Sequence, residues 1–441
     1  RSPSQLEFFL MSRRLSLPLF VCTLVATWYG GIFGVTKIIY NQGIFGYLSQ
    51  GVFWYVSYFL VAFVLLPKVF SYIKISSGTS QVSIYSLSQL VGIRLGTKAE
   101  KITAFFNIID VLPISYILSL GLLLSSFFNL NLFLSMLLGG TFVACYSIRG
   151  GFKSIVYTDA LQFFLMFLSV FLVVFFSIQQ HGSPDKIFFK SLPKSHFHLF
   201  GGESFFSVLM WFLLPFSTFV DPNFYQRFLA TGSLRRSKQG LLIAIVIWII
   251  FDIFILLGTL YAKSLIPFHD PKSAYLYYAV KLLPNGIRGL FLVGVLALVL
   301  STLDSYLFTS SKLISLHFSP FKKNNSIFFS KCITFALILP CSLFGLYFEG
   351  DLKEIWRFLA GFNFICLFLP VSLLIFYEKI MNEKTFIVSS LAPAVVMIFY
   401  ELFLHKNSFF QVDTFYVGIL CSFVVISASI LKKNIRQYFF S

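Results

Sequence analysis

Long apolar runs alternate with short polar segments along almost the whole chain. Read with a window of about 19 residues, the runs predict helices long enough to cross roughly 30 Å of hydrocarbon. They lie at residues 16–39, 44–70, 102–127, 131–147, 157–179, 203–230, 239–262, 285–317, 326–347, 353–377, 385–404 and 412–431. The pattern therefore predicts an all-α integral membrane protein with twelve transmembrane helices.

The polar segments leave no room for a separate soluble domain, because the longest are only residues 71–101, 180–202 and 263–284. Residues 1–441 are accordingly predicted to form a single transmembrane domain. Composition agrees: 57% of the residues are apolar and 12% are charged. A water-soluble protein of ordinary composition carries about twice that charged fraction.

The net charge of +17 could suggest a nucleic-acid partner, but no nucleic-acid motif accompanies it. Membrane topology explains the charge better, and the expected partner is a lipid bilayer. Basic residues collect on one side of the predicted helices, as cytoplasmic segments do in a cell membrane. Both ends of this chain, the basic segment 1–15 and the tail 432–441, are predicted to be cytoplasmic. The segments assigned to that side are 1–15, 68–101, 148–156, 227–238, 318–331, 378–384 and 432–441.

The first ten helices divide into two sets of five, residues 16–179 and 203–377, followed by two extra helices at 385–431. An odd number makes the second set enter the membrane from the opposite side, which is the five-plus-five inverted repeat of many secondary transporters. Such repeats carry an interrupted helix at matching places. The sequence WYGG at residues 28–31 and Pro215 with Asp221-Pro222 predict broken first and sixth helices. Gly and Pro are also common in unbroken membrane helices.

The eighth predicted helix carries a polar stripe at helical spacing, which predicts a face turned toward protein or water. Its members are Ser301, Asp304, Ser305, Phe308, Ser311 and Lys312. The adjacent hydroxyls of Ser301 and Thr302 supply two hard oxygens of the kind that a small cation such as sodium requires. An equally good interpretation is that these hydroxyls form hydrogen bonds between helices.

Acids inside a membrane are costly, so each is a candidate for a functional site. They are Asp110, Asp159, Asp221, Asp252 and Asp304. Asp221 is the best placed to meet a substrate, because it adjoins a proline in a breakable helix. The alternative, a cap on the helical segment that follows Pro222, is equally sound.

Signals of enzymatic chemistry are absent from the sequence. The six cysteines form no Cys-x-x-Cys pair, and no phosphate-binding loop or arrangement of Ser, His and acid can be recognised. His196 and His198 have metal-like spacing but lie in a polar loop, where they are expected to be solvated. We therefore expect no enzyme activity, no cofactor and no metal other than sodium.

Several segments together resemble the sodium/solute symporter family, which includes proline, sialic acid and galactose symporters and the choline transporters. The resemblance covers roughly residues 6–375 and implies a LeuT-like core. It also implies one more helix upstream of this chain. The segments that carry it are LEFFLMSRRLSLP at 6–18, ATWYGG at 26–31, GGFKSIVYTDALQ at 150–162, DPNFYQR at 221–227 and STLDS at 301–305.

The resemblance implies a sodium site made of backbone carbonyls and the two adjacent hydroxyls. The implied ligands are Leu24, Thr27, Leu298, Ser301 and Thr302. A shift of one residue in the first helix selects the carbonyls of Val25 and Trp28 instead. Asp159 matches the acid on the family's cytoplasmic sodium exit path.

The resemblance also implies a substrate pocket between helices one, two, three, six and ten. The candidates are Trp28, Tyr29, Trp54, Asp221 and Asn363. Aromatic rings at these places can surround an organic cation, although so many aromatic residues usually serve packing. Choline transporters place a tryptophan where this chain has Asp221, so choline itself is not the expected solute.

We therefore expect a sodium-coupled secondary active symporter that imports a small organic solute by alternating access, and the solute is expected to carry a positively charged nitrogen. Proton coupling through Asp304 or Asp221 is an alternative. Another alternative is a membrane sensor or binding module with the same fold but no flux. The identity of the solute and the oligomeric state stay open.

Overall fold

The computed structural model describes residues 4–79, 84–320, 325–347, 352–377, 380–404 and 413–440. Within these ranges the regular structure is helical. The elements in chain order are α1 (Gln5–Leu10), η1 (Met11–Arg13), α2 (Leu17–Ala26), η2 (Tyr29–Gly31), α3 (Ile32–Gln42), α4 (Ile44–Tyr47), η3 (Leu48–Val52), α5 (Phe53–Leu60), η4 (Val61–Leu65), α6 (Leu66–Thr79), α7 (Leu87–Leu95), α8 (Thr97–Asp110), α9 (Ile114–Phe128), α10 (Leu132–Gly150), α11 (Phe152–His181), α12 (Pro184–Ser191), η5 (Lys194–Phe197), α13 (Phe205–Leu213), η6 (Leu214–Phe219), α14 (Pro222–Thr231), α15 (Leu234–Leu265), α16 (Ala274–Leu282), α17 (Ile287–His317), α18 (Ser326–Ala336), α19 (Ile338–Tyr347), α20 (Leu352–Phe376), α21 (Glu383–Phe399), η9 (Tyr400–Leu404) and α22 (Thr414–Phe440).

In the described part of the chain, 11 helical segments are long and apolar enough to cross a membrane. They coincide with eleven of the predicted runs, so the all-α multi-pass architecture is confirmed. The remaining run, residues 385–404, corresponds to α21, which has 17 residues and continues into the π-helical turn η9. The count of twelve transmembrane helices and the inverted repeat stay predictions.

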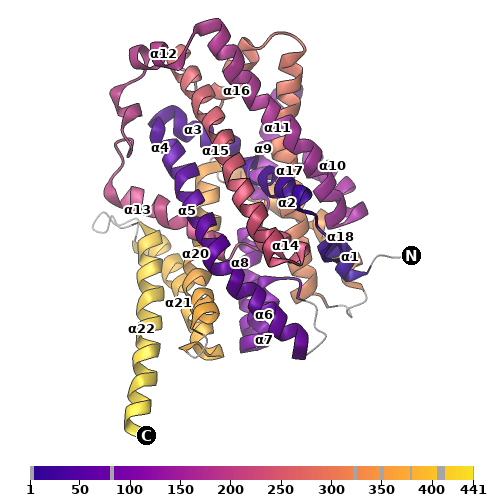
Figure 1. The fold of residues 1–441 in the computed structure, drawn as a ribbon, viewed down its shortest axis with the longest axis vertical. Helices are drawn as coiled ribbons and strands as arrows, with labels where there is room; N and C mark the ends of the chain where they lie inside the picture. The colour runs from indigo at the N-terminus through magenta and orange to yellow at the C-terminus, as the bar shows by residue number, and fades with distance from the viewer. Residues whose placement is uncertain are drawn as a thin grey trace.

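The polar segments gather at the two ends of the helix bundle (Figure 1). The short helices α12 and α16 lie at one end, whereas α6, α7 and the carboxyl end of α22 lie at the other. We call these the α12 end and the α7 end. The arrangement puts α6, α7 and the carboxyl end of α22 on the same side of the bundle.

The first membrane-crossing segment is interrupted where glycines were expected to weaken it. Helix α2 ends at Ala26, the short 3-10 turn η2 follows, and α3 begins at Ile32. Gly30 is needed in this turn because a Cβ there would lie 2.5 Å from the Cβ of Thr302 on α17. The missing side chain therefore lets the broken helix contact α17 directly.

The sixth segment is interrupted as well. Helix α13 passes into the 3-10 turn η6 at Leu214, and α14 begins at Pro222. Proline at the first helical position lacks only an N–H that no helical carbonyl would accept. The freed carbonyl of Pro215 accepts a hydrogen bond from Ser57 Oγ at 2.7 Å. Both predicted helix breaks are thus present.

The second segment is helical throughout but not α-helical throughout. Two π-helical turns, η3 and η4, flank α5. Each π turn closes its hydrogen bond one residue further along the chain than an α turn does. Gln50 and Gly51 lie in η3, next to the cavities described below.

The most extensive helix–helix contact near the breaks is that between α11 and α17. Gly294 makes it close, because a Cβ there would meet the Cβ of Ser169 at 2.4 Å. Helix α2 packs on the same pair. The hydroxyl residues of α17 are therefore held against the first helix break by rigid elements.

Candidate functional site

The polar stripe of α17 is turned into the protein. Each member exposes 4% of its surface or less, although Asp304 and Lys312 are charged types that proteins rarely bury. The stripe consists of Ser301, Asp304, Ser305, Phe308, Ser311 and Lys312. The interpretation of this face as one that meets protein is confirmed.

The two adjacent hydroxyls of α17 touch the first helix break. Ser301 Oγ lies 2.9 Å from the carbonyl oxygen of Ala26, to which it donates. Thr302 Oγ1 accepts the N–H of Gly30 at 2.9 Å and lies 3.1 Å from the carbonyl of Leu298. Four oxygens of the kind that sodium binds are thus gathered at one junction.

The carbonyl that Ser301 meets belongs to neither register considered from the sequence. Ala26 lies between Leu24 and Thr27 of the first register and between Val25 and Trp28 of the shifted one. Thr27 approaches α17 through its hydroxyl, which lies 3.5 Å from Ser305 Oγ. The set of five sodium ligands stays a prediction.

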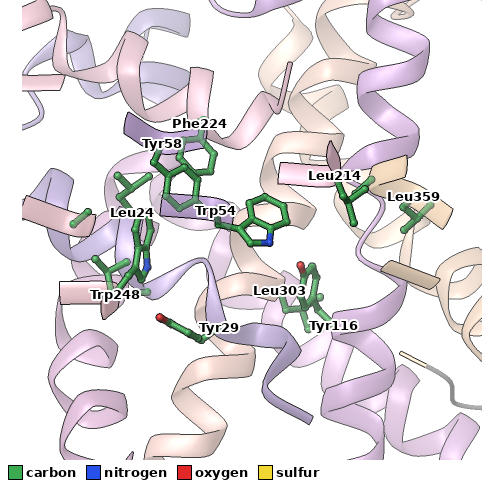
Figure 2. Packing of buried hydrophobic residues seen from close by; sticks show 14 of the residues in the cluster. Leu24, Tyr29, Trp54, Tyr58, Tyr116, Leu214, Phe224, Trp248, Leu303 and Leu359 are labelled. Carbon is green, nitrogen blue, oxygen red and sulfur yellow. The ribbon is translucent and has the colours of Figure 1, made fainter. Parts of the chain in front are cut away.

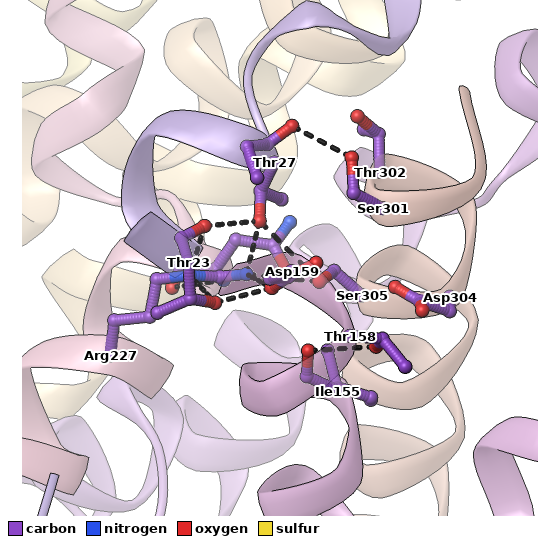
Figure 3. Close-up of polar contacts among 12 residues, drawn as sticks. Thr23, Thr27, Ile155, Thr158, Asp159, Arg227, Ser301, Thr302, Asp304 and Ser305 are labelled. Atoms are coloured by element: carbon purple, nitrogen blue, oxygen red, sulfur yellow. Dashed lines mark hydrogen bonds and ion pairs between the residues drawn. The ribbon is translucent and has the colours of Figure 1, made fainter. Parts of the chain in front are cut away.

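Next to this junction lies a group that we call the arginine cluster: Thr23, Thr27, Asp159, Arg227 and Ser305 (Figure 3). Arg227, from α14, exposes 1% of its surface. Its Nη2 lies 3.6 Å from Asp159 Oδ2 and donates to Ser305 Oγ at 2.9 Å and to Thr27 Oγ1. Its Nε lies 3.3 Å from the carbonyl and from the hydroxyl of Thr23.

The burial of Arg227 corrects the sequence interpretation, which counted it in a cytoplasmic segment beginning at residue 227. Hydropathy alone places Arg227 at the end of the helix, because a guanidinium lowers the mean hydropathy of its window whether the side chain points outward or inward. The carboxylate of Asp159 is its partner and is fully buried, also accepting from Thr23 Oγ1. The other oxygen of Asp159, Oδ1, has no hydrogen-bond partner among the described residues.

Asp304, on the same stripe of α17, is also fully buried. Tyr146 of α10 donates to its Oδ2 at 2.9 Å. Its Oδ1 has no partner in the described part of the chain. The acid is therefore held by one neutral donor.

Asp221 carries out the capping role that the sequence left open. Its Oδ1 accepts the N–H of Asn223 at 2.7 Å, which satisfies one of the free donors at the start of α14. The same side chain lines a cavity together with Asp110, Trp28 and Trp54. Capping and facing a cavity are thus combined in one residue.

Asp110 of α8 is the second acid of this cavity. Asn363 of α20 donates to its Oδ2 from Nδ2 at 2.8 Å. The predicted candidates Trp28, Trp54 and Asp221 therefore line one cavity, and Asn363 contacts its wall. We call it the Asp221 cavity.

A second cavity is lined by Asp252 of α15 and by Trp28, Tyr29 and Gln50. Tyr29 donates to Asp252 Oδ1 at 2.8 Å, and Tyr55 donates to Oδ2. We call this the Asp252 cavity. The sequence identified Asp252 only as an acid inside the membrane, because its two phenol partners come from other helices.

Several aromatic rings pack against one another near the first break, and Trp54, Tyr58 and Trp248 are among those labelled in Figure 2. The ring centroid of Trp28 lies 4.4 Å from that of Trp54 and 5.6 Å from that of Tyr58. Trp248 of α15, which the sequence did not single out, lies 6.2 Å from Trp28. Trp28 is only partly buried, so its ring is accessible from the cavities.

The sequence predicts that both histidines at the α12 end are solvated, but only His198 is exposed. His196 exposes 4% of its surface, and its Nε2 lies 3.1 Å from the carbonyl of Tyr40. Burial lowers the pKa of His196, whereas His198 is exposed. Within the described ranges, no three His, Cys, Asp or Glu residues are grouped so that they could hold a metal ion.

A model of the sodium:solute symporter family matches residues 8–327. The chain belongs to the sodium:solute symporter family. This match includes both helix breaks, the arginine cluster and the hydroxyl pair of α17. Membership places the chain among multi-pass membrane transport proteins and not among enzymes.

Curated relatives in this family are distant. The chain is 24% identical over 318 residues to sodium/glucose cotransporter 4 of Danio rerio, covering 63% of this chain and 48% of the relative. It is 24% identical over 247 residues to the high-affinity proline transporter PutP of Bacillus subtilis (strain 168), covering 53% and 52%. The matches thus span about half the length of these relatives.

Solved structures share the fold. A sodium-coupled sialic acid symporter in a substrate-bound outward-open state superposes with a TM-score of 0.76 at 15% identity, covering 99% of this chain and 93% of that one. A nucleobase-cation-symport-1 family transporter in a closed conformation gives 0.58 at 11% identity, covering 98% and 95%. At these identities the likeness concerns the fold, and the solute of this family member has to be argued from its own site.

Proposed function

We propose that this member of the family is a sodium-coupled symporter that carries a small organic solute with a positively charged nitrogen across a cell membrane. The observation that carries the proposal is the contact between the Ser301–Thr302 pair and the first helix break. Sodium prefers hard oxygen ligands, and broken helices expose carbonyl oxygens. Here both kinds of oxygen meet at one buried junction.

Bound sodium ties α2 to α17, which stabilises the arrangement in which the solute pocket is open to one side. Coupling follows because the ion has different affinities for the two arrangements of these helices. Asp159 lies next along the path toward the α7 end, and its free Oδ1 is an acceptor for the departing ion. The α7 end is assigned to the cytoplasm, on the strength of its Lys and Arg residues.

The preference for a positively charged nitrogen rests on the Asp221 cavity. Two carboxylates, Asp110 and Asp221, line it, and their described partners are an amide and a backbone N–H. An ionised acid away from water needs a cation nearby. The rings of Trp28 and Trp54 add faces on which an ammonium group is attracted.

Uptake into proteoliposomes tests the sodium coupling. An inward sodium gradient should drive accumulation of the transported solute, and replacing sodium with potassium at constant pH should abolish it. Equal uptake under both conditions contradicts sodium coupling.

Asp221→Asn tests the charged-nitrogen preference, because Asn keeps the capping oxygen and removes the charge. The affinity for amine solutes should fall roughly tenfold or more, the size of one lost charge-assisted hydrogen bond. The melting temperature should change little. Unchanged amine affinity would leave Asp221 with the capping role alone.

Proton coupling is a second candidate, favoured by one observation. Asp304 is fully buried with Oδ1 unpartnered among the described residues, so it can hold a proton without losing a hydrogen bond. The same proteoliposomes with a pH gradient and no sodium distinguish this candidate. Accumulation under that condition, lost in Asp304→Asn, supports it.

A further inference from the structure

The Asp252 cavity and the Asp221 cavity are adjacent. Both are lined by Trp28, Ser115 and Tyr116, so these three side chains form the boundary between them. The Asp221 cavity holds two acids and the Asp252 cavity holds one. Three carboxylates thus surround a space that is divided by two aromatic rings.

The carboxylate of Asp252 is built into its position. It exposes 6% of its surface and receives one phenol hydroxyl on each oxygen, from Tyr29 and Tyr55. Gly51 makes room for it, because a Cβ there would lie 3.1 Å from Asp252 Oδ2. The two phenol hydrogen bonds favour the ionised carboxylate, whereas its burial opposes the charge. A cation in the cavity would shift this balance toward the ionised form.

A second buried polar group faces the same cavity. Gln50 exposes 5% of its surface, and its Oε1 has no hydrogen-bond partner among the described residues. A buried acceptor without a donor is costly unless a ligand supplies one. The Asp252 cavity therefore offers a carboxylate and a free amide oxygen but shows no cation of its own: in the described part of the chain, no ion pair involves Asp252.

We propose that the solute carries two positively charged nitrogens, as a linear diamine does, with one nitrogen at Asp252 and Gln50 and the other at Asp221 and Asp110. This rests on the proposed transport function and extends it, since a single ammonium group can occupy only one of the two cavities. The aliphatic part of the diamine passes between Trp28 and Tyr116. Its charges compensate one carboxylate in each cavity.

An inorganic cation fits the Asp252 cavity less well than an organic ammonium. Sodium requires about five or six oxygens in its coordination shell, and the walls here are largely aromatic or aliphatic: Trp28, Val35, Ile38 and Tyr116. An ammonium group satisfies two or three acceptors by hydrogen bonds and is attracted to ring faces. The lining therefore favours an alkylammonium group.

Equilibrium binding to the purified full chain tests the proposal. The probes are straight-chain diamines from diaminobutane to diaminooctane and the monoamines of equal length, each titrated at constant sodium concentration and ionic strength with thermal stability as the signal. One diamine length should bind roughly tenfold or more tightly than its monoamine, as a second charge-assisted contact allows. If no diamine exceeds its monoamine, the proposal is wrong.

Two variants and one control locate the second nitrogen. Asp252→Asn should reduce the affinity for the best diamine to that of the monoamine, whereas Asp185→Asn, which removes an exposed acid at the α12 end, should leave the difference intact. Gly34→Leu is the independent variant, because nothing lies within 4 Å of a Cβ at Gly34, which lines the cavity. The added side chain should fill the Asp252 cavity and abolish the diamine preference even where Asp252→Asn fails to fold.

Other outcomes overturn the inference without touching the proposed function. If Asp252→Asn raises the sodium concentration needed for stabilisation and leaves diamine affinity unchanged, the acid holds sodium and the second nitrogen is absent. If neither amine series binds while another solute is taken up with sodium, the proposed sodium symport is supported and the diamine inference is wrong. Tight diamine binding with sodium-independent uptake is the reverse result: the diamine stands and sodium coupling fails.

Discussion

The arginine cluster and the two acidic cavities both adjoin the first helix break, yet they balance charge in opposite ways. In the arginine cluster the guanidinium of Arg227 faces the carboxylate of Asp159, so acid and base come from the same chain. The carboxylates of Asp110, Asp221 and Asp252 are held by amides, phenols and a backbone N–H. Among the described residues, none of these three is in an ion pair.

This difference indicates which region balances its buried charges within the chain and which one favours a bound cation. A buried pair of opposite charges is self-sufficient, whereas a buried acid with neutral donors favours an external cation. The arginine cluster therefore joins α2, α11, α14 and α17 without needing a ligand, while Asp159 Oδ1 is still free to meet a passing ion. The acidic cavities are where the proposed solute would bind.

The largest expected effect comes from breaking the internal ion pair. Arg227→Gln leaves the carboxylate of Asp159 buried without its cation and should destabilise the protein by about 3–5 kcal/mol. Adding Asp159→Asn should recover most of that loss, because no unpaired charge then remains. Chemical unfolding in detergent measures both variants, with the exposed Arg235→Gln as the control. A double variant as unstable as the single one would show that the pair is not the reason.

A smaller loss of stability is expected at the first helix break, which adjoins both the arginine cluster and the cavities. Gly30→Ala should cost about 1–3 kcal/mol, because the added methyl group overpacks against Thr302 and Tyr116 of rigid helices. Gly31→Ala is the matched control, since a Cβ there meets nothing within 4 Å. Thermal unfolding of the two variants under identical conditions checks the difference. Equal stability would mean that the break does not depend on close contact with α17.

The double variant Ser301→Ala/Thr302→Ala addresses the hydroxyls that join the regions. It should raise the sodium concentration for half-maximal uptake roughly tenfold or more, equivalent to about 1.4 kcal/mol. Solute affinity at saturating sodium should change less. Ser310→Ala is the control, because that hydroxyl bonds only carbonyls of its own helix. An unchanged sodium requirement in the double variant contradicts the proposed ligands.

The smallest effect concerns the loop at the α12 end that contains His196 and contacts Tyr40. Burial lowers the pKa of His196 below its ordinary value of 6.5, so the folded protein favours the neutral ring. The unfolded chain binds the proton more readily, and stability should therefore fall as the pH drops below 6.5. Melting temperatures between about pH 8 and pH 5 check this. His196→Gln should flatten the curve, and the exposed His198→Gln should not.

Features that depend on residues close together in the sequence were predictable. Membrane helices are visible in sequence because hydrocarbon forces the backbone to satisfy its hydrogen bonds within each segment. The breaks at Gly30 and Pro222 and the cap at Asp221 follow from local rules for glycine, proline and helix ends. The buried stripe of α17 follows from helical periodicity.

Features that depend on partners far along the chain were not predictable. Arg227 looks like a loop residue until Asp159, 68 positions earlier, is placed beside it. Asp252 looks isolated until Tyr29 and Tyr55 arrive from the first two membrane segments. Hydropathy has no information on such pairs, because it averages neighbours in sequence. The sodium ligands keep their two candidate registers for the same reason.

The π turns of the second segment have a consequence for mutational scanning. An α-helix advances about 100° per residue, so each additional residue in η3 and η4 rotates everything beyond it by roughly that angle. A substitution scan through residues 44–79 should therefore show three short periodic patterns whose phase jumps at Leu48–Val52 and again at Val61–Leu65. Deleting a single residue from η3 would restore the α-helical phase and turn Tyr55 away from Asp252, without removing either partner.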